Sequence, residues 1–210
     1  MMKRFLSLVL PFLALFLAVP AMAADEAPDA LVKRVTEEVL TIVRSDKEIQ
    51  GGSTQKAIAL VEAKVLPNFD FNRMTALAMG RDWRKASPEQ KKVLVNEFRT
   101  LLVRTYSNAL TTYKNQTVDF KPFKMQPSDV EVLVRTQVNQ PAGKPIQIDY
   151  SLEKLDDGWK VFDVIVAGVS LVTNYRETFA QEVRTGGVDG LIKSLQAKNK
   201  ATETKVADKK

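Results

Sequence analysis

Asp163 is the residue whose position most suggests chemistry, because it interrupts the apolar run from Val161 to Val166. A carboxylate among apolar residues can have a raised pKa and act as a general acid or base, as in some small α+β enzymes. The alternative is a structural carboxylate, satisfied by neighbouring backbone or by an arginine. No second carboxylate or tyrosine is placed by local spacing to complete a catalytic pair, so the pattern favours the structural role.

Other reactive groups are scarce in this chain, which has no cysteine and no histidine in 210 residues. This excludes a thiol nucleophile, a disulfide framework, a cysteine-linked lipid anchor, a Ser-His-Asp triad and imidazole metal ligands. Gly51-Gly52 and Gly186-Gly187 stand at expected helix ends rather than in a phosphate-binding loop. The acidic residues have no calcium-loop spacing. Such a composition is more typical of a binding protein than of an enzyme.

The segment 1–23 is typical of a secretory signal peptide. Lys3 and Arg4 precede a mainly apolar stretch, 5–19, and residues 21–23 read Ala-Met-Ala before the expected cleavage point. The stretch is shorter than the roughly 20 residues that span a bilayer, although an uncleaved anchor is the alternative. We predict a soluble mature protein outside the cytoplasm, in a bacterial periplasm.

The formal net charge is +6, with charges of both signs interspersed. The basic cluster 81–85 could suggest nucleic acid, but export argues against such a partner. Weak attraction to anionic lipid surfaces or to an acidic partner is the more consistent interpretation.

Helical spacing of apolar residues dominates the first half of the mature chain. It predicts helices after Pro28, over 53–65 and over 70–78. Ser87, Pro88 and Gln90 form a capping-box pattern that begins a long helix. Its apolar stripe continues for about six turns and comprises Leu94, Phe98, Leu101, Leu102, Tyr106, Ala109, Leu110 and Tyr113.

Between 117 and 166 the apolar period changes to two, which predicts four antiparallel strands. We place them at 117–123, 130–138, 146–155 and 159–166, with Asp157-Gly158 as a hairpin turn. After Gly168 the helical period returns; Gly186-Gly187 ends one helix and a short last helix follows. The order predicts an α+β fold, with helices packed on one face of a curved antiparallel four-stranded sheet. The segment 199–210 lacks apolar periodicity and is predicted to be a disordered tail.

Several longer motifs resemble the MlaC family, also called the toluene-tolerance auxiliary family. They are the runs 73–75, 80–90, 98–106, 159–164 and 168–176, followed by Phe179 and the run 187–191. The resemblance covers nearly the whole mature chain and assigns 24–198 as a phospholipid-binding domain.

The resemblance implies a fold related to the NTF2-like cone, a deep apolar pocket between sheet and helices, and no enzymatic activity. It implies no cofactor, with bound phospholipid as cargo. It also implies a shuttle between an outer-membrane lipoprotein complex and an inner-membrane ABC transporter complex with its lipid-transfer subunit. Such a shuttle maintains the lipid asymmetry of the outer membrane.

A phospholipid carrier must enclose two acyl chains. Transfer of each CH₂ from water to an apolar environment is favourable by about 0.8 kcal/mol. We therefore predict that the tails lie between the apolar face of the sheet and the long helices, with the headgroup near the mouth. The predicted lipid-binding residues are Phe98, Leu102, Tyr106, Leu110, Val132, Val134, Ile148, Tyr150, Leu152, Trp159, Val161, Val172 and Tyr175.

Two other functions stay open from the sequence. An NTF2-like isomerase or hydratase would use Asp163 in an open pocket. A periplasmic chaperone or adaptor would have a filled interior and an exposed apolar patch instead.

Overall fold

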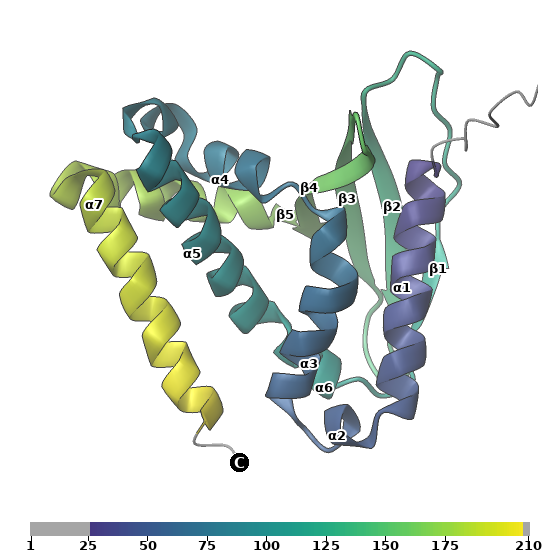
Figure 1. Ribbon diagram of the computed structural model, residues 1–210. Helices are drawn as coiled ribbons and strands as arrows, with labels where there is room; N and C mark the ends of the chain where they lie inside the picture. The colour runs from purple at the N-terminus through teal and green to yellow at the C-terminus, as the bar shows by residue number, and fades with distance from the viewer. Residues whose placement is uncertain (1–25, 208–210) are drawn as a thin grey trace, which may run out of the picture.

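The computed structural model describes residues 26–207, and the signal peptide predicted at 1–23 lies outside this range. Helices come first, then a sheet, then helix again (Figure 1), as the α+β prediction requires. Before the sheet, the helices are α1 (Pro28–Ser45), α2 (Lys47–Gln50), α3 (Thr54–Leu60), α4 (Phe71–Met79), α5 (Pro88–Tyr106) and α6 (Asn108–Thr111). A π-helical turn, η1 (Val61–Val65), and a 3₁₀ turn, η2 (Leu66–Asn68), extend α3, and a second 3₁₀ turn, η3 (Gly80–Lys85), follows α4.

The helix starts follow the predicted capping residues. The Ser87 hydroxyl accepts a hydrogen bond from the Gln90 N–H (3.2 Å), and the Gln90 side chain accepts one from the Ser87 N–H (2.9 Å). This capping box satisfies two backbone donors that the first turn of α5 would otherwise leave unpaired. Asp70 likewise caps α4 by accepting from the Arg73 N–H (2.9 Å).

The stripe predicted through Tyr113 is not one continuous helix. α5 ends at Tyr106, and the single turn α6 follows after Ser107. Serine, asparagine and threonine dominate this segment, and their side chains compete for backbone hydrogen bonds. The Thr111 hydroxyl, for example, donates to the Asn108 carbonyl (2.8 Å).

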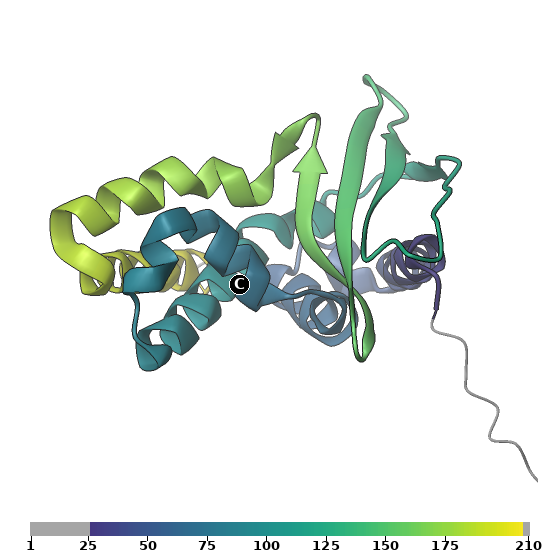
Figure 2. The same ribbon diagram turned by 90° about the horizontal axis from the view of Figure 1, so that it is seen from above.

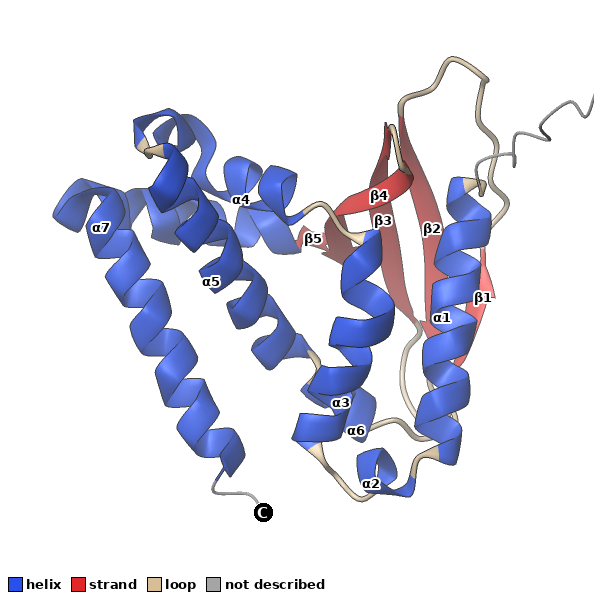
Figure 3. Cartoon of the chain, in the orientation of Figure 1, coloured by secondary structure: helices blue, strands red, loops and turns tan. Residues whose placement is uncertain are grey.

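The sheet is antiparallel, but its predicted strand number was wrong. It contains five strands in the order β1-β2-β3-β4-β5 (Figure 3). They are β1 (Thr117–Phe120), β2 (Glu131–Asn139), β3 (Ile146–Leu155), β4 (Gly158–Val166) and β5 (Val169–Ser170). Ala167 and Gly168 have positive φ angles of 50° and 84°, and this tight turn returns the chain to pair with β4.

One bulge interrupts the pairing of β3 with β4. The register joins Ser151 to Asp163 and Leu152 to Val161, so Phe162 lies between two pairs and has no partner. A bulge inserts one residue and displaces the alternation of side chains that follows it. Two successive side chains of β4 that face α1, Val161 and Val164, are therefore three residues apart in the sequence rather than two.

The helices fall into two groups (Figures 1 and 2). α1 lies along one face of the sheet, whereas α4, α5 and α7 (Leu171–Ala207) pack together beyond β4 and β5. Two of the three buried clusters follow this division, and the third joins α1 to α2 and α3 through Val39, Val43, Ile49 and Leu60. One cluster joins α1 to the strands through Leu31, Val32, Val134, Leu152, Trp159 and Val161. The other joins the three long helices through residues such as Met74, Phe98, Phe179 and Leu191.

The helix after Gly168 is interrupted at Gly187 (φ 66°), where the sequence predicts a helix end. The sequence predicts a disordered tail from residue 199, but in the structure α7 continues to Ala207. Asn199 is buried, and its side-chain amide donates to the Glu97 carboxylate (2.7 Å). Alanine, lysine and glutamate are good helix formers, so this segment can be helical without an apolar stripe.

Candidate functional site

Two apolar cavities lie between the helices and the sheet. The first, here the α1 cavity, has a volume of about 220 Å³ and lies between the inner side of α1 and the strands. Its lining comprises Leu31, Val32, Val35, Thr36, Val39, Leu40, Val65, Asn68, Phe69, Leu110, Val118, Val138, Tyr150 and Val161.

The second cavity, here the α5 cavity, has a volume of about 310 Å³ and extends toward the C-terminal end of α5. Its lining comprises Val39, Val61, Val65, Leu66, Phe69, Phe71, Met74, Leu102, Val103, Tyr106, Ser107, Leu110, Tyr150, Val164 and Leu171. The π-helical turn η1 contributes both Val61 and Val65. Such turns are frequent at functional sites.

The two cavities are neighbours, because they share the lining residues Val39, Val65, Phe69, Leu110 and Tyr150. No charged side chain belongs to either lining. Concave apolar surfaces with a few polar groups are typical of small-molecule sites. This pair of cavities can enclose hydrocarbon.

Burial favours the neutral form of two tyrosines, Tyr150 in the lining of both cavities and Tyr175 beside the cluster of the long helices. Burial raises the pKa of Tyr150, although the nearby Thr136 side chain lowers it. Burial also raises the pKa of Tyr175 to about 12, and Tyr106 beside it acts in the same direction. Tyr106 is 40% exposed and lines the α5 cavity, so its side chain belongs both to the cavity wall and to the protein surface.

The structure brings five of the thirteen predicted lipid-binding residues to the cavities. Leu102 and Tyr106 line the α5 cavity, Val161 lines the α1 cavity, and Leu110 and Tyr150 line both.

The other eight predicted residues lie elsewhere in the fold. Val134, Leu152 and Trp159 are buried in the cluster between α1 and the sheet, and Val132 packs against it. Phe98 and Val172 are buried in the cluster of the long helices, and Tyr175 packs against them. Ile148 is partly buried on β3, opposite Thr136. Arg176 donates two hydrogen bonds to the Leu77 carbonyl.

Sequence reasoning missed the contribution of α1 and of η1. Val35 and Val39 belong to the apolar stripe that predicted α1, but a stripe indicates only that a face is covered. Phe69, which lines both cavities, lies between η2 and α4, outside any periodic segment. Its only sequence signal is a large apolar residue directly before a helix cap.

Asp163 is a helix cap. Its carboxylate accepts hydrogen bonds from the Ser170 hydroxyl (2.5 Å) and from the backbone N–H of Val172 (3.2 Å) at the start of α7. Because of the bulge, Asp163 faces away from the cavities, whereas Val161 and Val164 line them. The structural interpretation of this carboxylate therefore agrees with its contacts.

Replacing Asp163 with alanine is expected to lower the free energy of unfolding by about 2 kcal/mol. The change removes a cap and leaves a buried backbone N–H without an acceptor. Urea denaturation measures the loss. Asp163→Asn, which keeps one acceptor oxygen, should lose less. Equal stability of the alanine variant and the unmodified protein would contradict the capping role.

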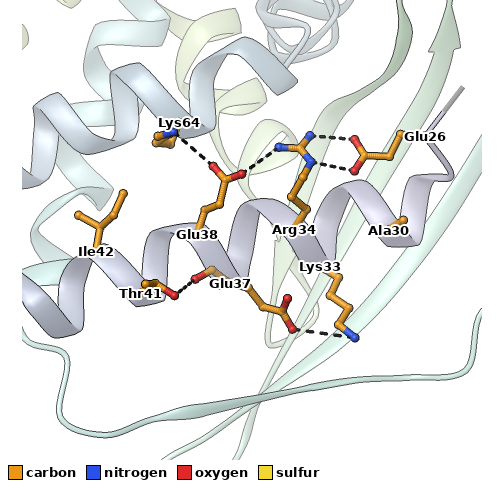
Figure 4. Close-up of a pocket in the computed structure, with 9 residues that line it drawn as sticks. All are labelled: Glu26, Ala30, Lys33, Arg34, Glu37, Glu38, Thr41, Ile42 and Lys64. Atoms are coloured by element: carbon orange, nitrogen blue, oxygen red, sulfur yellow. Dashed lines mark hydrogen bonds and ion pairs between the residues drawn. The ribbon is translucent and has the colours of Figure 1, made fainter. Parts of the chain in front are cut away.

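A larger and more open hollow of about 590 Å³ lies on the polar side of α1 (Figure 4). Ion pairs cross it: Arg34 with Glu26 (2.8 Å), Arg34 with Glu38 (3.6 Å) and Glu38 with Lys64 of η1 (3.5 Å). Exposed pairs of this kind contribute little stability. Most of its lining residues are charged, unlike those of the two apolar cavities.

Two absences hold within residues 26–207. No helix there is long and apolar enough to cross a membrane. No group of three or more acidic, cysteine or histidine side chains in that range could hold a metal ion.

Comparison with known proteins extends these observations. The family described as MlaC protein matches residues 33–197. A toluene tolerance protein, ttg2D, of Pseudomonas putida is 31% identical over 84% of this chain and 83% of its own length. The intermembrane phospholipid transport system binding protein MlaC of Haemophilus influenzae is 22% identical, with 93% and 92% covered.

A solved structure is also similar. It is the phospholipid-binding protein of Ralstonia solanacearum in complex with a phospholipid. The two chains share 40% sequence identity and superpose with a TM-score of 0.78, covering 86% of this chain and 99% of the other.

Proposed function

The chain belongs to the MlaC protein family, and from this premise we propose that it is a periplasmic carrier of intact phospholipid. The observation that carries the proposal is the pair of adjoining cavities without charged lining residues. The acyl tails lie in these cavities, and the headgroup stays near the opening beside Tyr106.

Enclosure is the physical requirement for such a carrier. When a two-chain lipid moves through water, exposing each methylene costs about 0.8 kcal/mol of free energy. The protein must therefore replace water along most of both chains. The two cavities are small for complete chains. Loading therefore widens them, and the boundary between α1 and η1 is the place where the helices separate, since both elements line the α1 cavity.

The proposed partners follow from the relatives. The Haemophilus protein is named as the binding protein of an intermembrane phospholipid transport system. For this chain we infer exchange of lipid with an inner-membrane ABC transporter complex, through its lipid-transfer subunit, and with an outer-membrane lipoprotein complex. That exchange would maintain outer-membrane lipid asymmetry. The proposal involves no catalysis, no cofactor and no nucleic acid, and it keeps the expected relation to the NTF2-like fold.

The alternatives have less support. Asp163, which an isomerase or hydratase would need in an open pocket, caps α7 and lines neither cavity. A chaperone with a filled interior would lack the cavities. Its docking face would also need a large apolar patch, whereas the two most exposed large apolar side chains among residues 26–207 are separate in the chain, Val130 just before β2 and Val169 in β5.

Lipid extraction tests the carrier proposal directly. The protein purified from the periplasm is extracted with organic solvent, and mass spectrometry identifies the lipids recovered per mole of protein. We expect intact two-chain phospholipid well above the amount in a mock purification from cells without the protein. Recovery at the mock level would contradict the proposal.

A further inference from the structure

Ser107 has a buried side chain whose hydroxyl has no hydrogen-bond partner among residues 26–207. The residue is 2% exposed and lies between the end of α5 and the start of α6. Its backbone is satisfied, because its N–H donates to the Val103 carbonyl (2.9 Å) and its carbonyl accepts from the Leu110 N–H (3.1 Å). The side-chain hydroxyl alone remains unpaired.

Neighbouring hydroxyls in the same segment are paired. Thr105 donates to the Leu101 carbonyl (2.7 Å), and Thr111 donates to the Asn108 carbonyl (2.8 Å). These are the usual partners of a serine or threonine in a helix. Ser107 does not use the equivalent carbonyl, so its hydroxyl stays available to a group inside the α5 cavity, which it lines.

Ser107 also differs from the other buried polar groups that have an unpaired atom. Asp149, Glu153 and Asn199 each have one such oxygen, but each side chain makes a hydrogen bond through its other polar atom. None of the three lines either apolar cavity. An unpaired buried hydroxyl is unfavourable, so its place in a ligand cavity indicates a partner on the ligand.

The location of Ser107 restricts what that partner can be. The preceding residue, Tyr106, is exposed and lines the same cavity. Leu102 and Val103, about one helical turn earlier in α5, are buried apolar walls of this cavity. A polar group at a boundary between water and hydrocarbon matches the glycerol ester region of a phospholipid, which joins the headgroup to the acyl chains.

On the basis of the proposed function, we propose that the Ser107 hydroxyl donates a hydrogen bond to an acyl ester carbonyl of the bound phospholipid. The contact positions the glycerol region at the cavity opening and makes the protein select ester-linked over ether-linked lipid. An ether-linked chain lacks the carbonyl oxygen, so binding it leaves the buried hydroxyl unpaired.

A competition experiment tests this selection. The protein is incubated with vesicles that contain ester-linked and ether-linked phosphatidylglycerol in equal amounts, with matched chain lengths, and then repurified. Mass spectrometry measures the ratio of the two lipids bound. One hydrogen bond of ordinary net strength corresponds to a preference of roughly two- to tenfold for the ester form. Ser107→Ala should bind both forms at a ratio of about one.

Ser45→Ala is the matched control. The Ser45 hydroxyl is exposed and already paired with the carbonyls of Thr41 and Ile42 (both 3.1 Å), so this variant should retain the ester preference. Thermal unfolding of Ser107→Ala should show no loss of stability, because the hydroxyl removed has no partner in the protein.

Each outcome is decisive. A wild-type ratio of one, or an ester preference that Ser107→Ala retains, overturns the assignment of Ser107 and leaves the carrier function intact. A hydroxyl that only holds a trapped water would give the first of these results. Recovery of neither lipid with the wild-type protein would contradict the carrier function as well.

Discussion

Replacing Leu110 with tryptophan is expected to reduce the phospholipid that co-purifies with the protein by about tenfold or more. Leu110 lines both cavities, and a larger ring there occupies space in each. Every methylene kept out of the cavities costs about 0.8 kcal/mol of binding free energy, so excluding two of them corresponds to roughly this factor. The measurement is the molar ratio of lipid to protein after extraction.

Leu155→Trp provides the matched control for this result. Leu155 is 37% exposed at the end of β3 and lines neither apolar cavity, so this variant should carry as much lipid as the unmodified protein. Circular dichroism and thermal unfolding establish that both variants are folded. Full lipid content in a folded Leu110→Trp protein would mean that the tails lie elsewhere.

Replacing Phe98 with alanine is expected to lower the free energy of unfolding by about 3–5 kcal/mol, the range for truncating a buried aromatic residue. Phe98 is fully buried, and its ring packs edge-on against Tyr175 and Phe179 with centroid distances of 5.1 Å. Urea denaturation of lipid-free protein measures the loss, since bound ligand would add its own stabilisation. The remaining folded protein should still bind phospholipid, because Phe98 lines neither cavity.

The milder variant Phe98→Leu serves where the alanine variant does not stay folded. We expect a smaller loss of stability and an unchanged ratio of lipid to protein. A stable Phe98→Leu protein with little bound lipid would instead support the sequence-based assignment of Phe98 as a lipid contact.

The secondary structure was largely predictable because the relevant signals are local. A capping box, a glycine at a helix end and a period of two each involve residues within one or two turns of each other. Ser87 with Gln90, the interruption at Gly187 and the three longest strands follow from such signals. The short β5 does not, because its pairing depends on a turn at Ala167 and Gly168 that no pattern marks.

The site was less predictable because it depends on which element faces each apolar side chain. Phe98 and Leu102 belong to one stripe, one helical turn apart, and the sequence treats them alike. In the structure Phe98 packs against α7, whereas Leu102 lines the α5 cavity. Periodicity indicates that a face is covered, but it does not distinguish a packed neighbour from a space for a ligand.

Asp163 illustrates the same limit. With strict alternation, it would share a face with Val161 and point among the cavity residues. The unpaired Phe162 changes that face. Nothing in the run of residues from Val161 to Val166 marks where the extra residue is inserted.

The bulge at Phe162 also determines how this segment can change in length during evolution. Deleting this one residue would place Asp163 directly after Val161, so regular alternation would still point Asp163 away from the cavities and Val164 toward them. Pairing Phe162 regularly while keeping it would instead turn Asp163 toward the cavities; the start of α7 would lose its cap, and a carboxylate would stand among hydrocarbon chains. Sequences that carry the same lipid should therefore tolerate the loss of this bulged residue better than a change that draws it into the regular ladder.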